Sequence, residues 1–305
     1  MKRVFILFLS FLASLCFLDG LVSCLIKPVL LNEPDAGGNH SNFKWSLFDK
    51  KADIIVLGAS KANHHYITDS LESCFGMTVF NGGVDGDNIV SSRTQFDAMC
   101  DRQIPKIVII DLSGGQMAGN WESVFLEHKS YFGIEKHYTS VSKEFISTES
   151  RLKLYSSLYR INEDLLDIVS SYVKGNRSNN GFIPLIGTNS NLSHITKDNM
   201  PSYEMGEVQR RNLDHIVGYC KQNEIKLFIA YSPTLITYTN GVTETFESYC
   251  SDHELPFFCY EGDSTFVNHP EYFKDYNHLN LLGARVYTSD IITKILGNLE
   301  KREYY

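Results

Sequence analysis

The sequence predicts a doubly wound α/β domain, in which helices cover both faces of a mostly parallel sheet. The first observation is a series of short apolar runs rich in β-branched residues, which are typical of strands buried on both faces. The second is that amphipathic helical patterns separate these runs. The chain has 305 residues, of which 43% are hydrophobic and 21% are charged, so it can form a substantial core.

An apolar segment comes first. It covers residues 4–26, with Lys2 and Arg3 before it and Asp19 and Gly20 as its one interruption. It is long enough to cross a bilayer as a helix, for which about 20 residues suffice. The basic residues predict that the N-terminus stays in the cytoplasm and that the body lies outside the cytoplasmic membrane. We therefore expect a single-pass protein of the cell membrane with an N-terminal transmembrane helix.

A processed segment is the alternative. Residues 21–24, Leu-Val-Ser-Cys, are typical of a lipoprotein processing site, at which Cys24 would be lipidated and become the mature N-terminus. A lipoprotein anchored at Cys24 would also lie outside the cytoplasmic membrane. Asp19 is unfavourable in the core of a signal peptide, so the uncleaved anchor is preferred.

These signals divide the chain into three parts. Residues 1–27 form the membrane anchor or signal segment, residues 28–51 a linker rich in turn-forming residues, and residues 52–305 the α/β domain. An insertion at about 114–201 is longer than a crossover in such a fold needs. We expect it to be a helical cap that shapes access to a site, although a packing subdomain fits the pattern equally well.

The strands and helices of the domain follow from the apolar runs and the helical patterns. The expected strands are residues 53–57, 78–80, 106–111, 226–231 and 255–260. The expected helices are residues 88–102, 203–223 and 281–299. In such a sheet ligands bind beyond the carboxyl ends of the strands, so we expect the chemistry in the residues that follow each strand.

Composition argues against several classes of partner. The formal net charge of −8 leaves no basic surface of the kind that neutralises phosphates, so nucleic acid is not an expected partner. There is no C-x-x-C pair, and the adjacent His64 and His65 point in different directions, which argues against a metal site. Either histidine could instead line a substrate cleft. Five cysteines beyond the apolar segment are expected to be buried single thiols: Cys74, Cys100, Cys220, Cys250 and Cys259.

Two turns after the first strands could carry chemistry. Ser60 ends the turn Gly-Ala-Ser at residues 58–60, where a hydroxyl would be exposed at the sheet edge and a backbone N–H could face a developing oxyanion. Residues 81–86, Asn-Gly-Gly-Val-Asp-Gly, form a turn in which a glycine N–H can approach a ligand closely. Either turn alone could be only a loop.

The most selective motif lies near the C-terminus. Asp275 precedes His278 by three residues, before a long amphipathic helix. A carboxylate at this spacing can orient an imidazole and stabilise it while the imidazole takes a proton from a serine. This spacing therefore favours nucleophilic catalysis by a serine.

Together the motifs resemble the SGNH (GDSL) hydrolase superfamily. The matching residues, in order, are Gly58-x-Ser60, Asn81-x-Gly83-x-x-Gly86 and Asp275-x-x-His278-Leu279-Asn280-x-x-Gly283. The resemblance covers residues 53 to about 299. It implies a flavodoxin-like three-layer α/β/α domain and esterase, lipase-like or acyl-transfer chemistry.

The resemblance also implies roles for individual residues. Ser60 would be the nucleophile, His278 the general base and Asp275 the carboxylate that orients it. The N–H groups of Ser60 and Gly83 would form the oxyanion hole, with Asn81 supporting the loops. No metal or organic cofactor is expected.

One motif of the superfamily is missing. The superfamily usually has Gly-x-Asn after the third strand of the sheet, and the asparagine adds a donor to the oxyanion hole, whereas here Asp111 is followed by Leu-Ser-Gly-Gly. Loss of one such donor costs about 100- to 1000-fold in turnover. Ser113, Gln116 and Asn120 are the side chains that could replace it. Membrane-anchored SGNH proteins similar to those of teichoic acid D-alanylation and alginate acetylation also depart from the standard blocks.

Three functions are consistent with this pattern. The preferred one is a serine-dependent acyl-ester hydrolase, an esterase that acts outside the cytoplasmic membrane and deacylates a glycan or a small ester. The alternative is an O-acyltransferase component for an envelope or extracellular polysaccharide, with a membrane-bound acyltransferase as its partner. The third is a catalytically inactive glycan-binding pseudoenzyme, against which the intact Ser60, Asp275 and His278 argue.

Overall fold

The computed structural model of the chain describes residues 1–34, 39–175, 180–188, 191–198 and 200–303. It divides into two compact units. The smaller unit contains Met1–Ala36 and Leu126–Arg177, and the larger unit contains Gly37–Phe125 and Ser178–Tyr305.

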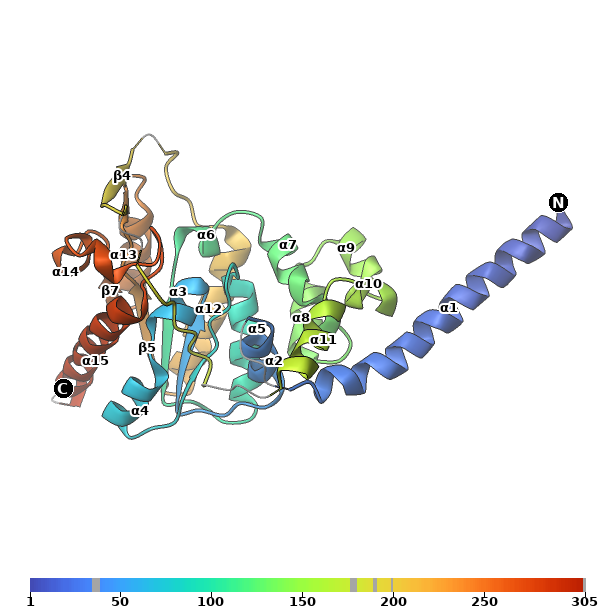
Figure 1. Cartoon of the computed structure of the whole chain (residues 1–305), viewed down its shortest axis with the longest axis horizontal. Coiled ribbons are helices and arrows are strands. Elements are labelled where there is room, and N and C mark those ends of the chain that lie inside the picture. Colours follow the sequence, from blue (N-terminus) through green and yellow to red (C-terminus); the bar gives the residue numbers. More distant parts are fainter. Residues whose placement is uncertain (35–38, 176–179, 189–190, 199, 304–305) are drawn as a thin grey trace. The chain divides into compact units, whose positions relative to one another are not determined.

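A parallel sheet of five strands, in the order β2-β1-β3-β5-β7, forms the centre of the larger unit (Figure 1). The prediction of an α/β domain with a mostly parallel sheet is confirmed. Each strand overlaps an expected run: β1 (Ile54–Gly58), β2 (Val79–Asn81), β3 (Ile107–Asp111), β5 (Lys226–Tyr231) and β7 (Phe257–Cys259). Gly58 at the end of β1 pairs with Asp111 at the end of β3, so the carboxyl ends of the central strands meet at one edge.

Helices cover this sheet, and every residue of β1 and β3 is buried. On one face Tyr287 and Ile291 of α15 (Leu281–Glu303) share a core with Val56 of β1 and Phe228 of β5. α5 (Ile89–Cys100) contacts β1, and α12 (Glu207–Gln222) contacts β5 and α5. These three helices correspond to the three helical patterns of the sequence.

The remaining elements of the larger unit are short. They are α2 (Asn39–Phe48), α3 (Ser60–His65), α4 (Thr68–Phe75), α6 (Gly114–Met117), α7 (Trp121–Phe125), α13 (Val242–Asp252), α14 (Ser264–Val267) and the 3₁₀ turn η2 (Pro270–Tyr272). A separate pair of parallel strands joins β4 (Ile195–Lys197) to β6 (Ile236–Tyr238). The sequence does not predict this pair, because a strand of three residues is too short to show an alternating or apolar pattern.

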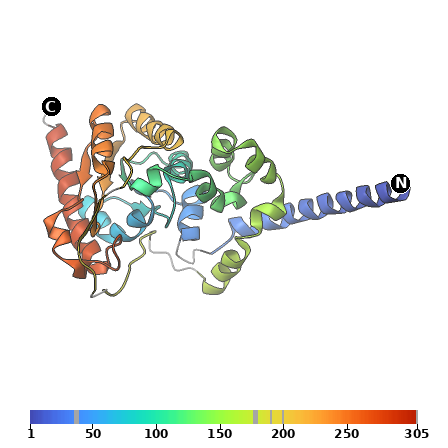
Figure 2. The same cartoon turned by 90° about the horizontal axis from the view of Figure 1, so that it is seen from above.

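The smaller unit is helical. Its elements are α1 (Lys2–Leu31), the 3₁₀ turn η1 (Leu126–Tyr131), α8 (Lys136–Phe145), α9 (Thr148–Lys153), α10 (Ser157–Ile161) and α11 (Leu165–Lys174). Ile26 and Leu30 near the end of α1 pack on Ile168 of α11, while the N-terminal part of α1 extends away from the other helices of this unit (Figure 2). Within the described residues, α1 alone has the length and apolar composition to span a membrane, a test that a signal sequence also passes.

The boundaries of the parts differ from the expected ones. Residues 28–31 of the expected linker belong to α1 and residues 39–48 form α2. α2 shows no amphipathic pattern because polar Asn42 and apolar Phe43 are both buried. Only residues 126–177 of the expected insertion cluster with α1, whereas its two ends belong to the larger unit.

The cysteines follow the expected pattern in part. All seven are free. Cys100, Cys220 and Cys250 are buried single thiols, as expected, whereas Cys74 and Cys259 are exposed. Exposure of these two thiols corrects the expectation that all five in the body are buried.

Candidate active site

Ser60 begins helix α3, two residues beyond the end of β1. The turn between them requires glycine at position 58, where φ is +145° and a Cβ would lie 2.6 Å from the carbonyl oxygen of Asp111. The backbone N–H of Ser60 is at the N-terminus of α3, where amides have no acceptor within the helix. The turn therefore presents both the hydroxyl and the amide of Ser60 at the carboxyl edge of the sheet.

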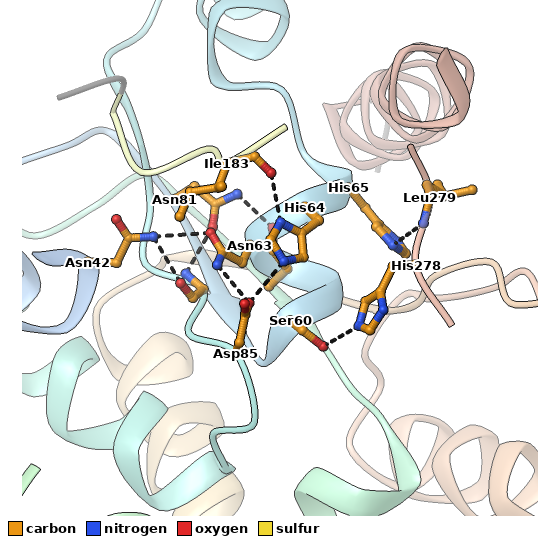
Figure 3. Close-up of polar contacts among 12 residues, drawn as sticks. Asn42, Ser60, Asn63, His64, His65, Asn81, Asp85, Ile183, His278 and Leu279 are labelled. Atoms are coloured by element: carbon orange, nitrogen blue, oxygen red, sulfur yellow. Dashed lines mark hydrogen bonds and ion pairs between the residues drawn. The ribbon is translucent and has the colours of Figure 1, made fainter. Parts of the chain in front are cut away.

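The structure brings the three predicted catalytic residues together. Nε2 of His278 lies 2.7 Å from Oγ of Ser60 (Figure 3), and Nδ1 lies 2.9 Å from each carboxylate oxygen of Asp275. The carboxylate also accepts hydrogen bonds from the backbone N–H groups of Asn277 and His278. With Nδ1 donating to the carboxylate, Nε2 is free to accept the proton of the Ser60 hydroxyl.

Asp275 is held in its charged form. Burial raises its pKa, but the hydrogen bonds from His278 and from the backbone of Asn277 outweigh burial, so the pKa lies below its usual value. An ionised carboxylate here stabilises positive charge on the imidazole.

The residues after His278 fix the loop that carries it. Oδ1 of Asn280 accepts hydrogen bonds from the N–H groups of Leu282 and Gly283 and so caps α15, while its Nδ2 donates to the carbonyl of Glu271. A Cβ at position 283 would lie 2.2 Å from the carbonyl oxygen of Tyr272. This contact explains why the Asp-x-x-His-Leu-Asn-x-x-Gly motif ends in glycine.

His65 is buried beneath this loop. Its Nε2 accepts a hydrogen bond from the N–H of Leu279 at 2.9 Å, and its Nδ1 lies 3.0 Å from Oγ of Ser232. Burial, together with the nearby charges of His278 and Lys61, holds the pKa of His65 well below its usual value. His65 is therefore neutral, with the proton on Nδ1.

The pKa of His64 is shifted in the opposite direction, above its usual value. Its Nε2 lies 3.1 Å from a carboxylate oxygen of Asp85, and its Nδ1 lies 2.7 Å from the carbonyl oxygen of Ile183 (Figure 3). Burial lowers its pKa, but the bonds to Asp85 and Ile183 outweigh burial and raise the pKa above the usual value. Neither His64 nor His65 lines the cavity at Ser60, in contrast to the expectation that one of them could line the cleft.

The second motif packs against α3. The N–H of Gly83 donates to Oδ1 of Asn81 at 2.9 Å, and Nδ2 of Asn81 donates to the carbonyl of Ala62 at 2.7 Å. A Cβ at position 83 would lie 2.3 Å from the backbone nitrogen of Asn63, so glycine is needed for this approach. The oxyanion role of Gly83 and the supporting role of Asn81 stay predictions.

Asn42 is a part of the site region that the sequence analysis missed. Its Nδ2 donates to the carbonyls of Gly83 and Gly181, at 3.0 and 2.8 Å, and to Oδ1 of Asn63 at 3.2 Å (Figure 3). It lies on α2, inside the segment that was expected to be a linker. No sequence pattern marks it, because its partners are distant in the chain.

A cavity of about 550 Å³ opens beside Ser60 and His278. Among its lining residues are Ser113, Tyr203, Tyr231 and Tyr238. Of the three side chains considered as replacements for the missing asparagine, Ser113 lines this cavity and Gln116 and Asn120 do not.

Lys61 of α3 and Asp111 at the end of β3 form a buried pair beside Ser60. Nζ of Lys61 is 4.0 Å from a carboxylate oxygen of Asp111 and 3.9 Å from the ring centre of Tyr231. Burial lowers the pKa of Lys61 and raises that of Asp111, while their mutual attraction opposes both shifts. Both residues line the cavity.

No family model matches the chain, and no curated protein sequence does. Among solved structures the chain is similar to a GDSL-like lipase from Bacteroides thetaiotaomicron, with 12% identity over 83% of this chain and 89% of that one, at a TM-score of 0.36. It is also similar to a lipase/acylhydrolase from Enterococcus faecalis, with 12% identity over 80% and 96% and a TM-score of 0.37.

Three features are observed in this chain independently of the comparisons. They are the order of the motifs, the parallel sheet, and the hydrogen bonds from Ser60 through His278 to Asp275. Together they place a serine, a histidine and a carboxylate at the carboxyl edge of a parallel α/β sheet.

Proposed function

We propose that this protein is a serine-dependent acyl-ester hydrolase that acts outside the cytoplasmic membrane on an acylated glycan or a small ester. The observation that carries the proposal is the continuous hydrogen bonding from Ser60 through His278 to Asp275 at the mouth of a cavity. A serine, a histidine and a carboxylate so arranged can perform acyl transfer without a metal.

In the proposed reaction, Oγ of Ser60 attacks the acyl carbonyl while Nε2 of His278 takes its proton. Asp275 stabilises the imidazolium. When the tetrahedral intermediate collapses, His278 returns the proton to the leaving alcohol and the acyl group stays on Ser60. Water then attacks this ester and gives its proton to His278, and the carboxylic acid leaves as Ser60 regains a proton.

The oxyanion needs donors at the edge of the sheet. The N–H of Ser60 is the better supported donor, because it begins α3. The N–H of Gly83 already donates to Asn81, so it would have to share or exchange this bond as the oxyanion forms. Turnover would therefore be sensitive to the position of the Asn81 side chain.

The cavity supports an acylated carbohydrate as the substrate class. Tyr203, Tyr231 and Tyr238 line it, and flat aromatic rings can cover the apolar faces of sugar rings. The buried Lys61 is paired with Asp111, so the pair adds no net charge and supports a neutral ester over an anionic one.

Acyl transfer is the second candidate function. The observation that favours it is the sequence after β3, where Asp111 is followed by Leu-Ser-Gly-Gly and no asparagine is present to strengthen the oxyanion hole. With that donor missing, attack by water would be slow, and a bound alcohol could take the acyl group from Ser60. Such an enzyme would work with a membrane-bound acyltransferase that supplies the acyl group.

Labelling with a fluorophosphonate probe tests the nucleophile in the full chain. We expect the wild type and a Ser113→Ala control to be labelled and Ser60→Ala to remain unlabelled, since Ser113 lines the same cavity without contacting His278. Release of product from an aryl acetate in water then supports the hydrolase. Labelling that leads to turnover only with an added alcohol or glycan acceptor supports the transferase, and a wild type that is not labelled supports the pseudoenzyme.

A topology reporter tests the proposed location separately. Alkaline phosphatase fused after Tyr305 is active only outside the cytoplasmic membrane. We expect an active fusion with the native α1, and an inactive fusion would contradict the extracytoplasmic location without bearing on the chemistry.

A further inference from the structure

Asp19 is the one acidic residue of helix α1, and the start of helix α10 binds it. Its Oδ1 accepts hydrogen bonds from the hydroxyl of Ser156 at 2.8 Å and from the N–H of Leu158 at 2.9 Å, and its Oδ2 accepts one from the N–H of Ser157 at 3.0 Å. The carboxylate thus satisfies the amides at the start of α10. Asp19 marks the level along α1 at which the rest of the smaller unit begins.

Three exposed apolar side chains surround this level. Leu158 is 37% exposed, Tyr155 64% and Leu152 66%; we call them the rim. Leu158 lies beside α1, because its own N–H binds Asp19. Leu152 lies in the last turn of α9 and Tyr155 on the turn that leads into α10, and the N–H of Tyr155 donates to the carbonyl of Leu152.

The length of α1 before Asp19 is too short to cross a bilayer. Fifteen helical steps separate Val4 from Asp19, which is about 22 Å at ~1.5 Å per residue. The hydrocarbon of a bilayer is about 30 Å thick, and tilting the helix would only shorten its span. If α1 crosses the membrane, the bilayer therefore extends to Asp19 and meets the rim.

The composition of the rim suits the interface of a bilayer. Leucine and tyrosine side chains with neighbouring basic residues are typical of segments that lie at the boundary between headgroups and acyl chains. Arg151 and Lys153 flank Leu152, and half of the Lys153 side chain is exposed. Asp19 itself keeps its hydrogen bonds within the protein, so its charge does not require water at this depth.

We propose that the rim of Leu152, Tyr155 and Leu158 inserts into the interface of the bilayer that α1 spans. The smaller unit is then a membrane-docking collar around α1. The inference rests on the proposal that α1 is a membrane anchor and is independent of the chemistry at Ser60.

Tryptophan reporters in the full chain test the docking. The chain has two tryptophans, Trp45 and Trp121, both in the larger unit, and they provide a constant background. We would place reporters by Leu158→Trp and Tyr155→Trp, and a matched control by Val173→Trp. Val173 is also an exposed apolar residue, and it lies on α11, which packs beside the end of α1 beyond the level of Asp19.

Each variant is reconstituted in phosphatidylcholine vesicles that contain lipids brominated near the headgroup end of the acyl chain. We expect the added emission of the two rim reporters to shift to shorter wavelength and to be largely quenched. The added emission of the Val173→Trp control should stay unquenched, because this position on α11 lies beyond the hydrocarbon.

Extraction with alkaline carbonate separates the docking from the anchor. If the protein resists extraction and the rim reporters are not quenched, docking is wrong while the anchor stands. If carbonate removes the protein, both are wrong. Rim emission that responds to the protein-to-lipid ratio and not to bromination would mean that a second copy covers the rim, which would also overturn the proposal.

Discussion

The backbone N–H of Leu279 donates a hydrogen bond to Nε2 of His65 over 2.9 Å. His65 ends the helix that begins with Ser60, and Leu279 follows His278 directly. This one bond therefore joins the helix of the proposed nucleophile to the loop of its proposed base. Its geometry gives His65 a positioning role, since the imidazole contacts neither the cavity nor the Ser60 hydroxyl.

Replacing His65 by phenylalanine should lower kcat about 10- to 100-fold with a smaller change in KM, because a displacement of the base by about 1 Å costs that much. Aryl acetate hydrolysis measures both constants. His215→Phe is the matched control, since His215 pairs with Asp97 away from the site. Equal effects of the two substitutions would argue against a positioning role.

The low pKa of His65 also predicts how stability depends on pH. In the unfolded chain this imidazole takes a proton near pH 6.5, whereas in the folded protein it resists protonation. The contribution of His65 to the free energy of unfolding is therefore complete above about pH 6.5. It is lost as the pH falls, with a slope of up to about 1.4 kcal/mol per pH unit. Urea unfolding at several pH values should show a steeper loss for the wild type than for His65→Phe. His64, whose pKa is raised, contributes in the opposite direction in both proteins, so parallel curves would refute the assignment to His65.

Asp275→Asn should reduce kcat by about 10⁴-fold, because an amide can reverse the tautomer of His278 and cannot stabilise its charged form. Thermal unfolding should change far less than activity. The chain offers a matched control in Glu271→Gln, whose carboxylate pairs with His269 at 2.8 Å on the surface. That variant should keep nearly full activity, and a comparable loss there would point to a general effect of charge.

Lys61→Met should destabilise the fold by about 3 kcal/mol, because it leaves the carboxylate of Asp111 buried without its cation. The double variant Lys61→Met/Asp111→Asn should recover part of this loss, since it buries no charge and an amide can still bond to Tyr66. Urea denaturation measures both. Additive losses in the double variant would show that the two residues are not coupled.

Gly58→Ala should destabilise the fold by about 2–4 kcal/mol and should also reduce activity, since a Cβ would meet the carbonyl of Asp111. The chain would then have to shift the turn that holds Ser60. Gly218→Ala in α12 is the control, because nothing lies within 4 Å of its Cβ position. It should be stabilising by about 0.5–1 kcal/mol, and a stable, active Gly58→Ala would contradict this account of the turn.

The sheet could be predicted from the sequence because each central strand is buried along its length, and such strands appear as unbroken apolar runs. The motif at Asp275 and His278 could be recognised for another reason. Its partners lie within a few residues, so the spacing alone defines the geometry. Contacts between Asn42 and Gly181, or between Asp19 and Ser156, join distant segments and leave no periodic trace.

The helix α2 lies inside the segment that was expected to be a linker. Turn-forming asparagines are frequent there. However, the amide of Asn42 donates hydrogen bonds to the carbonyls of Gly83 and Gly181, and the neighbouring Phe43 is fully buried. A helix enclosed on all sides has no polar stripe. Sequence periodicity cannot detect such a helix.

The hydrogen bond between Ser60 and His278 joins residues 218 positions apart in the chain. During synthesis Ser60 emerges long before His278, so no chain that still lacks His278 can hold the reactive pair. Closing the site also requires most of the sheet between them to be in place. Under the proposed location outside the membrane, the nucleophile would remain an ordinary alcohol until the exported chain has folded.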